Sequence, residues 1–160
     1  MTPINPKALD SLNWGISAEI KSYVFYLEAA KQATTKEFKE TLLKLAGDEK
    51  EHYRILERQH SSLITSELWI SYTDILKQKG LPEINEEMAD RHKELLDSVR
   101  KAPGQREILA VALILEKEAN EVFSKAAGNA VDPEEKRTFQ YLANFEKGHM
   151  KIIQGMIDSL

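Results

Sequence analysis

The sequence predicts an all-α protein built as a four-helix bundle, and three observations support this prediction. Apolar residues recur every three or four positions over most of the chain, which is the period of an amphipathic helix. Glycine and proline, the residues that interrupt helices, number only seven and five among 160 residues. The chain also aligns with itself, so two similar helical hairpins are expected.

Size and composition favour one globular domain over residues 1–160. Hydrophobic residues make up 42% and charged residues 30%, which allows a substantial core and argues against disorder. The net charge of −4 is spread over 22 basic and 26 acidic residues, so no concentrated positive field is available for nucleic acid. The absence of cysteine excludes disulfides, thiolate nucleophiles and iron–sulfur clusters, so any metal must bind through oxygen and nitrogen.

Membrane insertion is not expected. The longest nearly pure apolar stretch, 108–115, is far shorter than the roughly 20 residues that span a bilayer. The N-terminus also lacks a signal-peptide pattern. We therefore expect a cytoplasmic protein with no membrane partner.

The first two helices form a predicted antiparallel hairpin. The first begins at Asn5-Pro6 and ends near Ala33, with apolar residues on one face. A capping box formed by Thr34 and Glu37 opens the second, which we expect to run to about His60. Because the link between them is only a few residues long, the two helices should pack antiparallel.

The pattern then changes into a long, partly helical crossover. It contains a short apolar segment over 63–76, a break at Gly80-Leu81-Pro82 and an amphipathic stretch over 88–99. Such a connection carries the chain back along a bundle, so that the second hairpin can pack beside the first.

A second hairpin completes the chain. Its first helix should run from about Glu107 to Ala127 and stop at Gly128. Asp132-Pro133 with Glu135 then opens a last helix that reaches the C-terminus. Two hairpins joined by one long crossover make the ferritin-like bundle topology. The predicted boundaries are 6–60 for hairpin one, 61–104 for the crossover and 105–160 for hairpin two.

An internal repeat carries the chemistry. At an offset of 97 residues, 13 of the 41 positions from 16 to 56 are identical to their counterparts. The matched polar residues are Glu19 with Glu116, Glu49 with Glu146, and His52 with His149. Each glutamate lies on an apolar helix stripe, which points its carboxylate inward, and a Glu-x-x-His pair shares one helix face. Glutamates on a solvated surface are the alternative, which six matched positions on apolar stripes argue against.

Four buried carboxylates need compensation, because like charges at close range raise each other's pKa. Two divalent cations balance four negative charges, and neutral imidazoles complete the coordination. Oxygen-rich sites with some imidazole suit iron, our first choice, or manganese, whereas zinc could bind without redox chemistry. One glutamate from each of two helices and a Glu-x-x-His from each of the others is the ligand set of di-iron and di-manganese bundles.

These residues resemble the rubrerythrin branch of the ferritin-like superfamily over all four long helices. The resemblance rests on Glu19 with Tyr26, Asp48-Glu49-Lys50-Glu51-His52, Glu116 with Phe123, and Glu146-Lys147-Gly148-His149. It implies that Glu49 and Glu146 bridge two irons, with Glu19 and His52 on one and Glu116 and His149 on the other.

The resemblance also implies a function. Rubrerythrins reduce hydrogen peroxide, so we expect a di-iron oxidoreductase acting on peroxide or oxygen. Electrons would come from a separate donor such as rubredoxin, because a rubredoxin domain needs cysteine. A ferroxidase or iron-storage module and a non-catalytic metal-binding structural bundle are the alternatives. Rubrerythrin-like proteins are often dimers, so a homodimer is expected.

Two further positions bear on the chemistry. Ala119 stands where rubrerythrins have an additional glutamate that is associated with peroxidase turnover. Tyr26 could hydrogen-bond a ligand carboxylate, or could be a structural aromatic residue. With Tyr23 and Phe123, it is expected to shield the centre from solvent.

Overall fold

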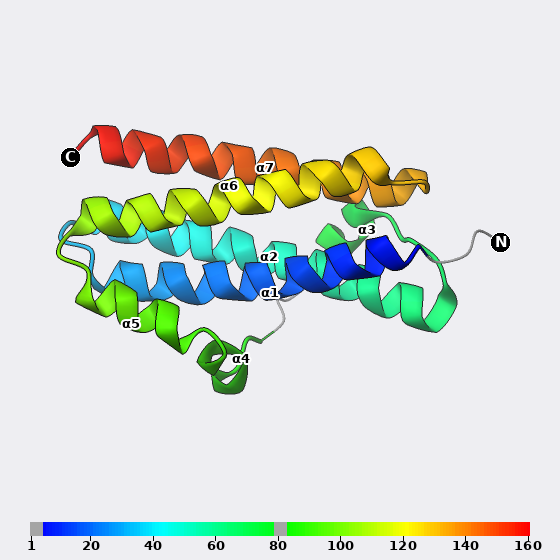
Figure 1. The fold of residues 1–160 in the computed structure, drawn as a ribbon, viewed down its shortest axis with the longest axis horizontal. Coiled ribbons are helices and arrows are strands. Elements are labelled where there is room, and N and C mark those ends of the chain that lie inside the picture. The colour runs from blue at the N-terminus through cyan, green and yellow to red at the C-terminus, as the bar shows by residue number, and fades with distance from the viewer. Residues whose placement is uncertain (1–4, 79–82) are drawn as a thin grey trace.

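The computed structural model describes residues 5–78 and 83–160, and these residues form helices without any strand (Figure 1). The helices are α1 (Pro6–Lys31), α2 (Lys36–Ser66), α3 (Tyr72–Lys77), α4 (Glu86–Asp90), α5 (Lys93–Lys101), α6 (Gln105–Asn129) and α7 (Pro133–Asp158). None of the helices in the described ranges has the length and apolar character needed to cross a membrane.

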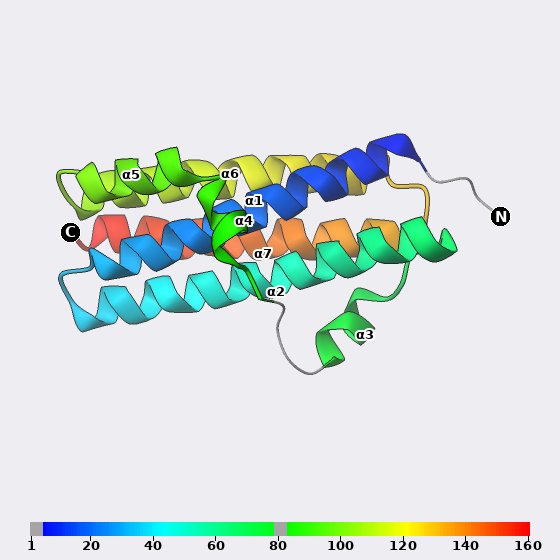
Figure 2. The same cartoon turned by 90° about the horizontal axis from the view of Figure 1, so that it is seen from below.

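The four long helices form the predicted bundle of two hairpins. Helices α1 and α2 run antiparallel in one hairpin and α6 and α7 in the other, and α1 packs against α6 (Figure 1). The crossover leaves the end of α2 and returns to the opposite end of the bundle, with α3, α4 and α5 on the outside (Figure 2). The all-α ferritin-like architecture is therefore confirmed. The predicted break at Gly80-Leu81-Pro82 lies outside the described residues.

The predicted end of the second helix was wrong. Helix α2 continues past residue 60 to Ser66, so the first hairpin is longer and the crossover shorter than expected. The added turns contain no glycine or proline, and Leu63, seven residues after Leu56, is buried in the core. The helix ends where Glu67 adopts a left-handed conformation, with φ 57°, and its N–H bonds to the carbonyl of Leu63.

Two other predicted helix ends need correction. Thr35, and not Thr34, caps α2, because its hydroxyl accepts a hydrogen bond from the N–H of Phe38. The hydroxyl of Thr34 instead accepts a hydrogen bond from the side chain of Gln105, which links the two hairpins. Gly128 does not stop α6, which ends one residue later at Asn129, where the chain turns extended before Asp132 and Pro133.

The predicted start signals of α1 and α7 were correct. The side chain of Asn5 caps α1 by accepting from the N–H of Lys7, and Pro6 follows it. Asp132 and Glu135 form a complete capping box at the start of α7. These caps satisfy N–H groups that have no partner within the helix.

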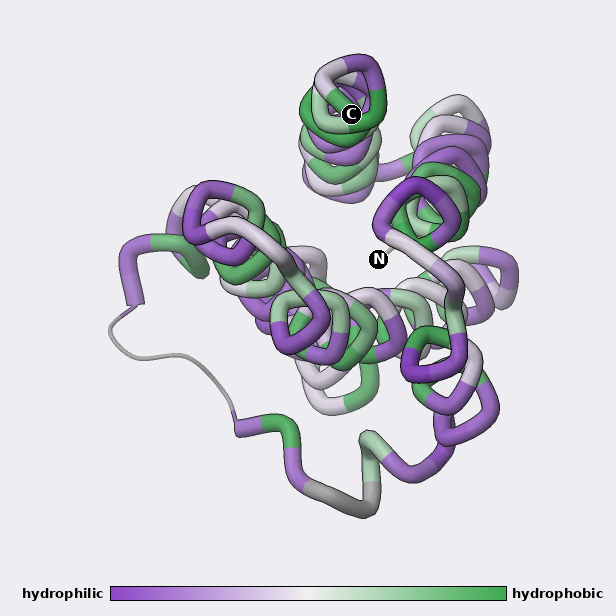
Figure 3. Tube along the Cα trace, turned by 90° about the vertical axis from the view of Figure 1, so that its left-hand side faces the viewer, coloured by the Kyte–Doolittle hydropathy of each residue, from purple (hydrophilic) through white to green (hydrophobic). Residues whose placement is uncertain are grey.

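The core is divided into two apolar clusters along the bundle. One cluster includes Phe25, Leu45 and Leu109, and the other includes Leu56 and Phe139. Figure 3 looks along the bundle, where the helices carry both hydrophilic and hydrophobic residues, as expected of amphipathic helices. On every long helix a buried glutamate lies between the residues of one cluster and those of the other, so a polar layer separates the clusters in the middle of the bundle.

Side-chain hydrogen bonds attach the crossover to the bundle. Gln59 of α2, fully buried, donates to the carbonyl of Ile70 and to Thr138 of α7, and accepts from the N–H of Ile70. At the other end of the crossover, Arg100 of α5 bonds to Glu28 of α1 at 3.0 Å. These contacts hold the crossover against the long helices while leaving the central polar layer untouched.

Close packing of α1 makes Gly15 sensitive to substitution. A Cβ atom at Gly15 would lie 2.9 Å from Leu56 Cδ1 and 2.9 Å from Phe123 Cε1, and both of these side chains are fully buried. We expect Gly15→Ala to destabilise the fold, because overpacking costs about 1–3 kcal/mol. The higher helix propensity of alanine offsets at most about 1 kcal/mol of this cost.

Gly155→Ala is the matched control, because nothing lies within 4 Å of a Cβ atom at this exposed helical position. It should stabilise the fold by about 0.5–1 kcal/mol. Urea unfolding of both variants in the same metal state measures the difference. Equal stability of the two variants would show that α1 can shift to accept the methyl group.

Candidate metal centre

All six predicted ligand residues meet in the polar layer at the middle of the bundle. They come one from α1, two from α2, one from α6 and two from α7: Glu19, Glu49, His52, Glu116, Glu146 and His149. Each of these residues is at most 1% exposed. The helix periodicity therefore placed these residues correctly in the interior, and metal binding by them stays a prediction.

The six residues fall into two groups that share two carboxylates. The His52 group consists of Glu19, Glu49, His52 and Glu146, and the His149 group of Glu49, Glu116, Glu146 and His149. Within each group, one possible ligand atom per residue lies within 4.8 Å of all the others. Sharing of Glu49 and Glu146 is the arrangement that two bridged cations require.

Both imidazoles present Nδ1 to the carboxylates. Nδ1 of His52 lies 2.9 Å from Glu146 Oε1 and 3.7 Å from Glu19 Oε2. Nδ1 of His149 lies 2.8 Å from Glu49 Oε1, with Glu116 and Glu146 at 3.3 and 3.4 Å. Nitrogen and oxygen donors thus converge from four helices.

Many of these donor atoms are buried without a hydrogen-bond partner among the described residues. The atoms of the predicted ligands in this condition are Glu19 Oε1 and Oε2, Glu49 Oε1, Glu116 Oε2, Glu146 Oε2, His52 Nε2 and His149 Nδ1. A buried polar atom without a partner is costly, and native proteins rarely keep several together. Five carboxylate oxygens and one Nδ1 facing one interior spot fit the coordination needs of divalent cations.

The electrostatics of the cluster also favour cations. Burial, followed by repulsion from neighbouring carboxylates, raises the pKa of Glu19, Glu49 and Glu116 well above the ordinary 4.5. Burial opposes ionisation of Glu146 too, but bonds to Glu116, His149 and His52 outweigh it and lower its pKa. In the metal-free protein the carboxyl groups with raised pKa values therefore bind protons, and metal binding must release these protons.

The same carboxylates act on the two imidazoles. Burial alone would lower the pKa of each histidine. At His52, the hydrogen bond and charge of Glu146 outweigh burial and raise the pKa. At His149, hydrogen bonds to carboxylates, of which that to Asp48 is the strongest, also outweigh burial and raise the pKa. In the metal-free protein, the two protonated imidazoles would neutralise part of the negative charge of the carboxylates.

Two side chains from outside the six hold ligand residues in place. Tyr26 donates a hydrogen bond of 2.5 Å to Glu116 Oε1, which is the contact suggested for it from the sequence. Asp48, for which the sequence suggested no role, lies 3.0 Å from His149 Nε2. The sequence feature that could have identified Asp48 is its position directly before Glu49, which places Asp48 at the edge of the helix face that carries Glu49.

Aromatic residues enclose the cluster, but not all of those expected. Tyr26 and Phe123 are fully buried, whereas Tyr23 is only partly buried. Nζ of Lys50 lies over the Tyr23 ring, 5.4 Å from its centre. Phe145, which the sequence did not single out, packs edge-on against both imidazoles, with ring centres 4.6 Å from His52 and 5.3 Å from His149.

Ala119 is buried among apolar side chains, 5% exposed, in the cluster that contains Phe123. It supplies no donor atom, so the six residues form the whole donor set that the described residues offer at this position. His92 is the N-cap residue of α5 in the crossover and belongs to neither group.

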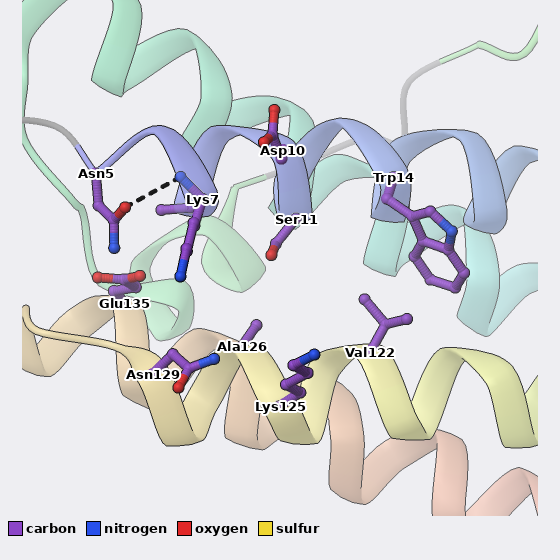
Figure 4. A pocket seen from close by; sticks show the side chains of 11 residues that line it. Asn5, Lys7, Asp10, Ser11, Trp14, Val122, Lys125, Ala126, Asn129 and Glu135 are labelled. Carbon is purple, nitrogen blue, oxygen red and sulfur yellow. Dashed lines mark hydrogen bonds between the residues drawn. The ribbon is translucent and has the colours of Figure 1, made fainter.

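Two surface cavities differ in their distance from the cluster of six residues. A groove of about 300 Å³ between α2 and α7 is lined by Asp48, Phe145 and His149 and reaches the edge of the cluster. A cavity of about 400 Å³ lies between the start of α1 and the end of α6, where Trp14 and Lys125 face it (Figure 4). Only the first of these contacts a member of the six.

The chain is similar to known proteins in sequence and in fold. A family model described as Rubrerythrin matches residues 10–157. A solved hypothetical protein from Pyrococcus furiosus is similar with a TM-score of 0.68 and 22% identity, covering 94% of this chain and 88% of that chain. At that identity the likeness shows the fold alone. No curated protein matches. Because the family model covers nearly the whole chain, the protein belongs to the rubrerythrin family, whose fold is the ferritin-like di-iron bundle.

Proposed function

We propose that this protein is a di-iron oxidoreductase that reduces hydrogen peroxide with electrons from a separate donor protein. One observation carries the proposal: two groups of buried donor atoms share Glu49 and Glu146, and most of these atoms lack a hydrogen-bond partner among the described residues. Glu19 and His52 would hold one iron, and Glu116 and His149 the other. Two bound irons would supply the two electrons that reduce peroxide to water.

The chain's own residues perform the remaining tasks. The four long helices fix the six donors in the interior, where the apolar clusters on either side exclude bulk water. Tyr26 holds its proton in a hydrogen bond to Glu116 and so fixes the orientation of that carboxylate. Phe145 covers the imidazoles on the side of the α2–α7 groove. This arrangement leaves small molecules such as peroxide as the substrates that fit best.

The electron donor must be another molecule or another part of a longer chain. These 160 residues contain no cysteine, so they cannot build the thiolate-bound iron site of a rubredoxin. We expect a small redox protein of that kind to serve as the donor.

A ferroxidase or iron-loading role is the second candidate, and Ala119 favours it. By the family resemblance, the additional glutamate expected near this position accompanies peroxidase turnover, and the buried Ala119 offers no oxygen. Oxygen must therefore be tested beside peroxide.

Stopped-flow absorbance of anaerobic protein loaded with two Fe(II) per chain distinguishes the candidates. We expect stoichiometric peroxide to produce the visible absorption of oxidised iron at least about ten times faster than oxygen, a barrier difference of about 1.4 kcal/mol. His52→Ala should abolish the fast phase. His92→Ala, which alters a histidine outside both groups, should leave it intact.

Other outcomes contradict the proposal. Faster reaction with oxygen, together with iron accumulation above two per chain, would select the ferroxidase. No colour change with either oxidant would indicate a structural bundle that holds zinc or no metal.

A further inference from the structure

The internal repeat preserves the ligands but not the residues around them. At the offset of 97 residues, Tyr26 is matched by Phe123 and Asp48 by Phe145. In both pairs a hydrogen-bonding side chain in the first hairpin is replaced by phenylalanine in the second. The two halves of the centre are therefore chemically different although their ligands are the same.

The His149 group receives both hydrogen-bonding side chains. Asp48 of α2 lies 3.0 Å from His149 Nε2 and accepts a hydrogen bond from the N–H at that nitrogen, so that Nδ1 faces the carboxylates. Tyr26 of α1 donates to Glu116 Oε1. Both ligand residues that belong to the His149 group alone are thus oriented by a side chain from another helix.

The His52 group has no equivalent support among the described residues. Nε2 of His52 is buried without a hydrogen-bond partner, and the ring of Phe145 lies almost perpendicular to the imidazole. Both carboxylate oxygens of Glu19 also lack a hydrogen-bond partner. The orientation of His52 therefore depends on packing, on its 2.9 Å contact with the shared Glu146 and on a bound cation. The orientation of Glu19 depends on packing and on a bound cation.

The His149 group is also closer to solvent than the His52 group. The groove between α2 and α7 is lined by Asp48 and His149, and the side chain of Asp48 is 21% exposed. Tyr141 and Phe145 pack against the ring of His52 and line a second groove of about 430 Å³, but His52 itself does not line that groove. An ion that enters by the groove would meet the His149 group first.

We propose that the two metal positions are inequivalent and fill in order, with the His149 group binding first and more tightly, and that Asp48 and Tyr26 are the positioning residues that cause the difference. The inference rests on the proposed two-metal function. Outer partners of metal ligands typically change affinity by about 10- to 100-fold, so the two dissociation constants should differ by at least about tenfold.

Titration of the metal-free protein with Co(II), followed by its visible absorption, tests the order. We expect two steps of one equivalent each. His52→Ala should remove the weaker step and keep the tight one, whereas His149→Ala should remove the tight one. Helix content measured by circular dichroism shows that each variant is folded, and a crystal of the wild type with one equivalent of Co(II) should show anomalous density at the His149 group.

Substitution of the positioning residues tests the cause. Tyr26→Phe and Asp48→Ala should each weaken the tight step by about 10- to 100-fold and leave the weaker step within about threefold, so that the two steps approach each other. Asp48→Asn should recover most of the affinity, because its amide oxygen can still accept from His149 Nε2. A merely structural role of Asp48 would weaken both steps alike and would not distinguish asparagine from alanine.

The titrations distinguish failure of this inference from failure of the proposed function. Two equivalents bound in one step of equal affinity, or first occupancy of the His52 group, would overturn this inference and leave the proposed function standing. Fewer than two equivalents bound to the folded wild type would overturn the two-metal function itself.

Discussion

Loading the metal-free protein with two equivalents of Fe(II) in the absence of oxygen should raise its Tm by about 10 °C or more. A ligand that binds only the folded state stabilises it by about 4 kcal/mol when its free concentration is about 1,000 times Kd. For a chain of this size, each kcal/mol raises the Tm by about 2–4 °C. The donor atoms without partners make this gain large, because the cations relieve both repulsion and unsatisfied polar groups.

Calorimetry of the metal-free and loaded forms at one pH measures the effect. Glu51→Gln is a suitable control, because Glu51 is 43% exposed and lies next to His52 in sequence but belongs to neither group. It should keep the full increase, whereas Glu49→Gln, which alters a shared carboxylate, should lose most of it. An equal increase in both variants would mean that iron stabilises the fold from somewhere else.

The second large effect is a fall in the stability of the metal-free protein as the pH rises from about 5 to 8. The raised pKa values of Glu19, Glu49 and Glu116 mean that the folded protein binds more protons than the unfolded chain above the ordinary glutamate pKa of 4.5. Stability then decreases with rising pH, because the unfolded state binds fewer protons.

The histidines act with the same sign. His52 and His149 have raised pKa values in the folded state, so the stability they contribute is complete below the ordinary value of 6.5 and is lost as the pH rises through the folded value. Glu146 has the opposite sign, because its pKa is lowered, but its contribution is lost only as the pH falls below about 4.5. No opposing contribution from the six residues remains between pH 5 and 8.

Urea unfolding at several pH values, with and without metal, measures this dependence. Glu19→Gln should flatten the slope of the metal-free protein and raise its stability above pH 7, while lowering its metal content. The loaded wild type should show no fall, because metal affinity increases as protons leave the ligands. A metal-free protein that gains stability between pH 5 and 8 would show that these carboxylates are ionised without cost.

The positions of the six residues could be predicted because they depend on local periodicity and on the repeat. A glutamate on an apolar stripe must point inward wherever the helix packs, and Glu49 with His52 share a face in any helix. The approach of Glu49 to Glu146 follows once both hairpins pack around one axis. Long-range geometry added little to this part of the result.

Other features could not be read from the local pattern. The contact between Asp48 and His149 joins residues 101 positions apart, and only the packing of α2 against α7 brings them together. The longer α2, by contrast, was available from the local pattern, because Leu63 lies seven residues after Leu56 and no glycine or proline interrupts the added turns. The cap at Thr35 was available from the repeat, since Thr35 matches Asp132, the N-cap residue of α7.

Anomalous scattering at the iron edge from crystals of the anaerobically loaded protein tests the central claim most directly. Two iron peaks should appear within the polar layer, one beside Nδ1 of His52 and the other beside Nδ1 of His149, with Glu49 and Glu146 contacting both. Iron density elsewhere on the molecule, with the six side chains arranged as in the metal-free protein, would contradict the claim.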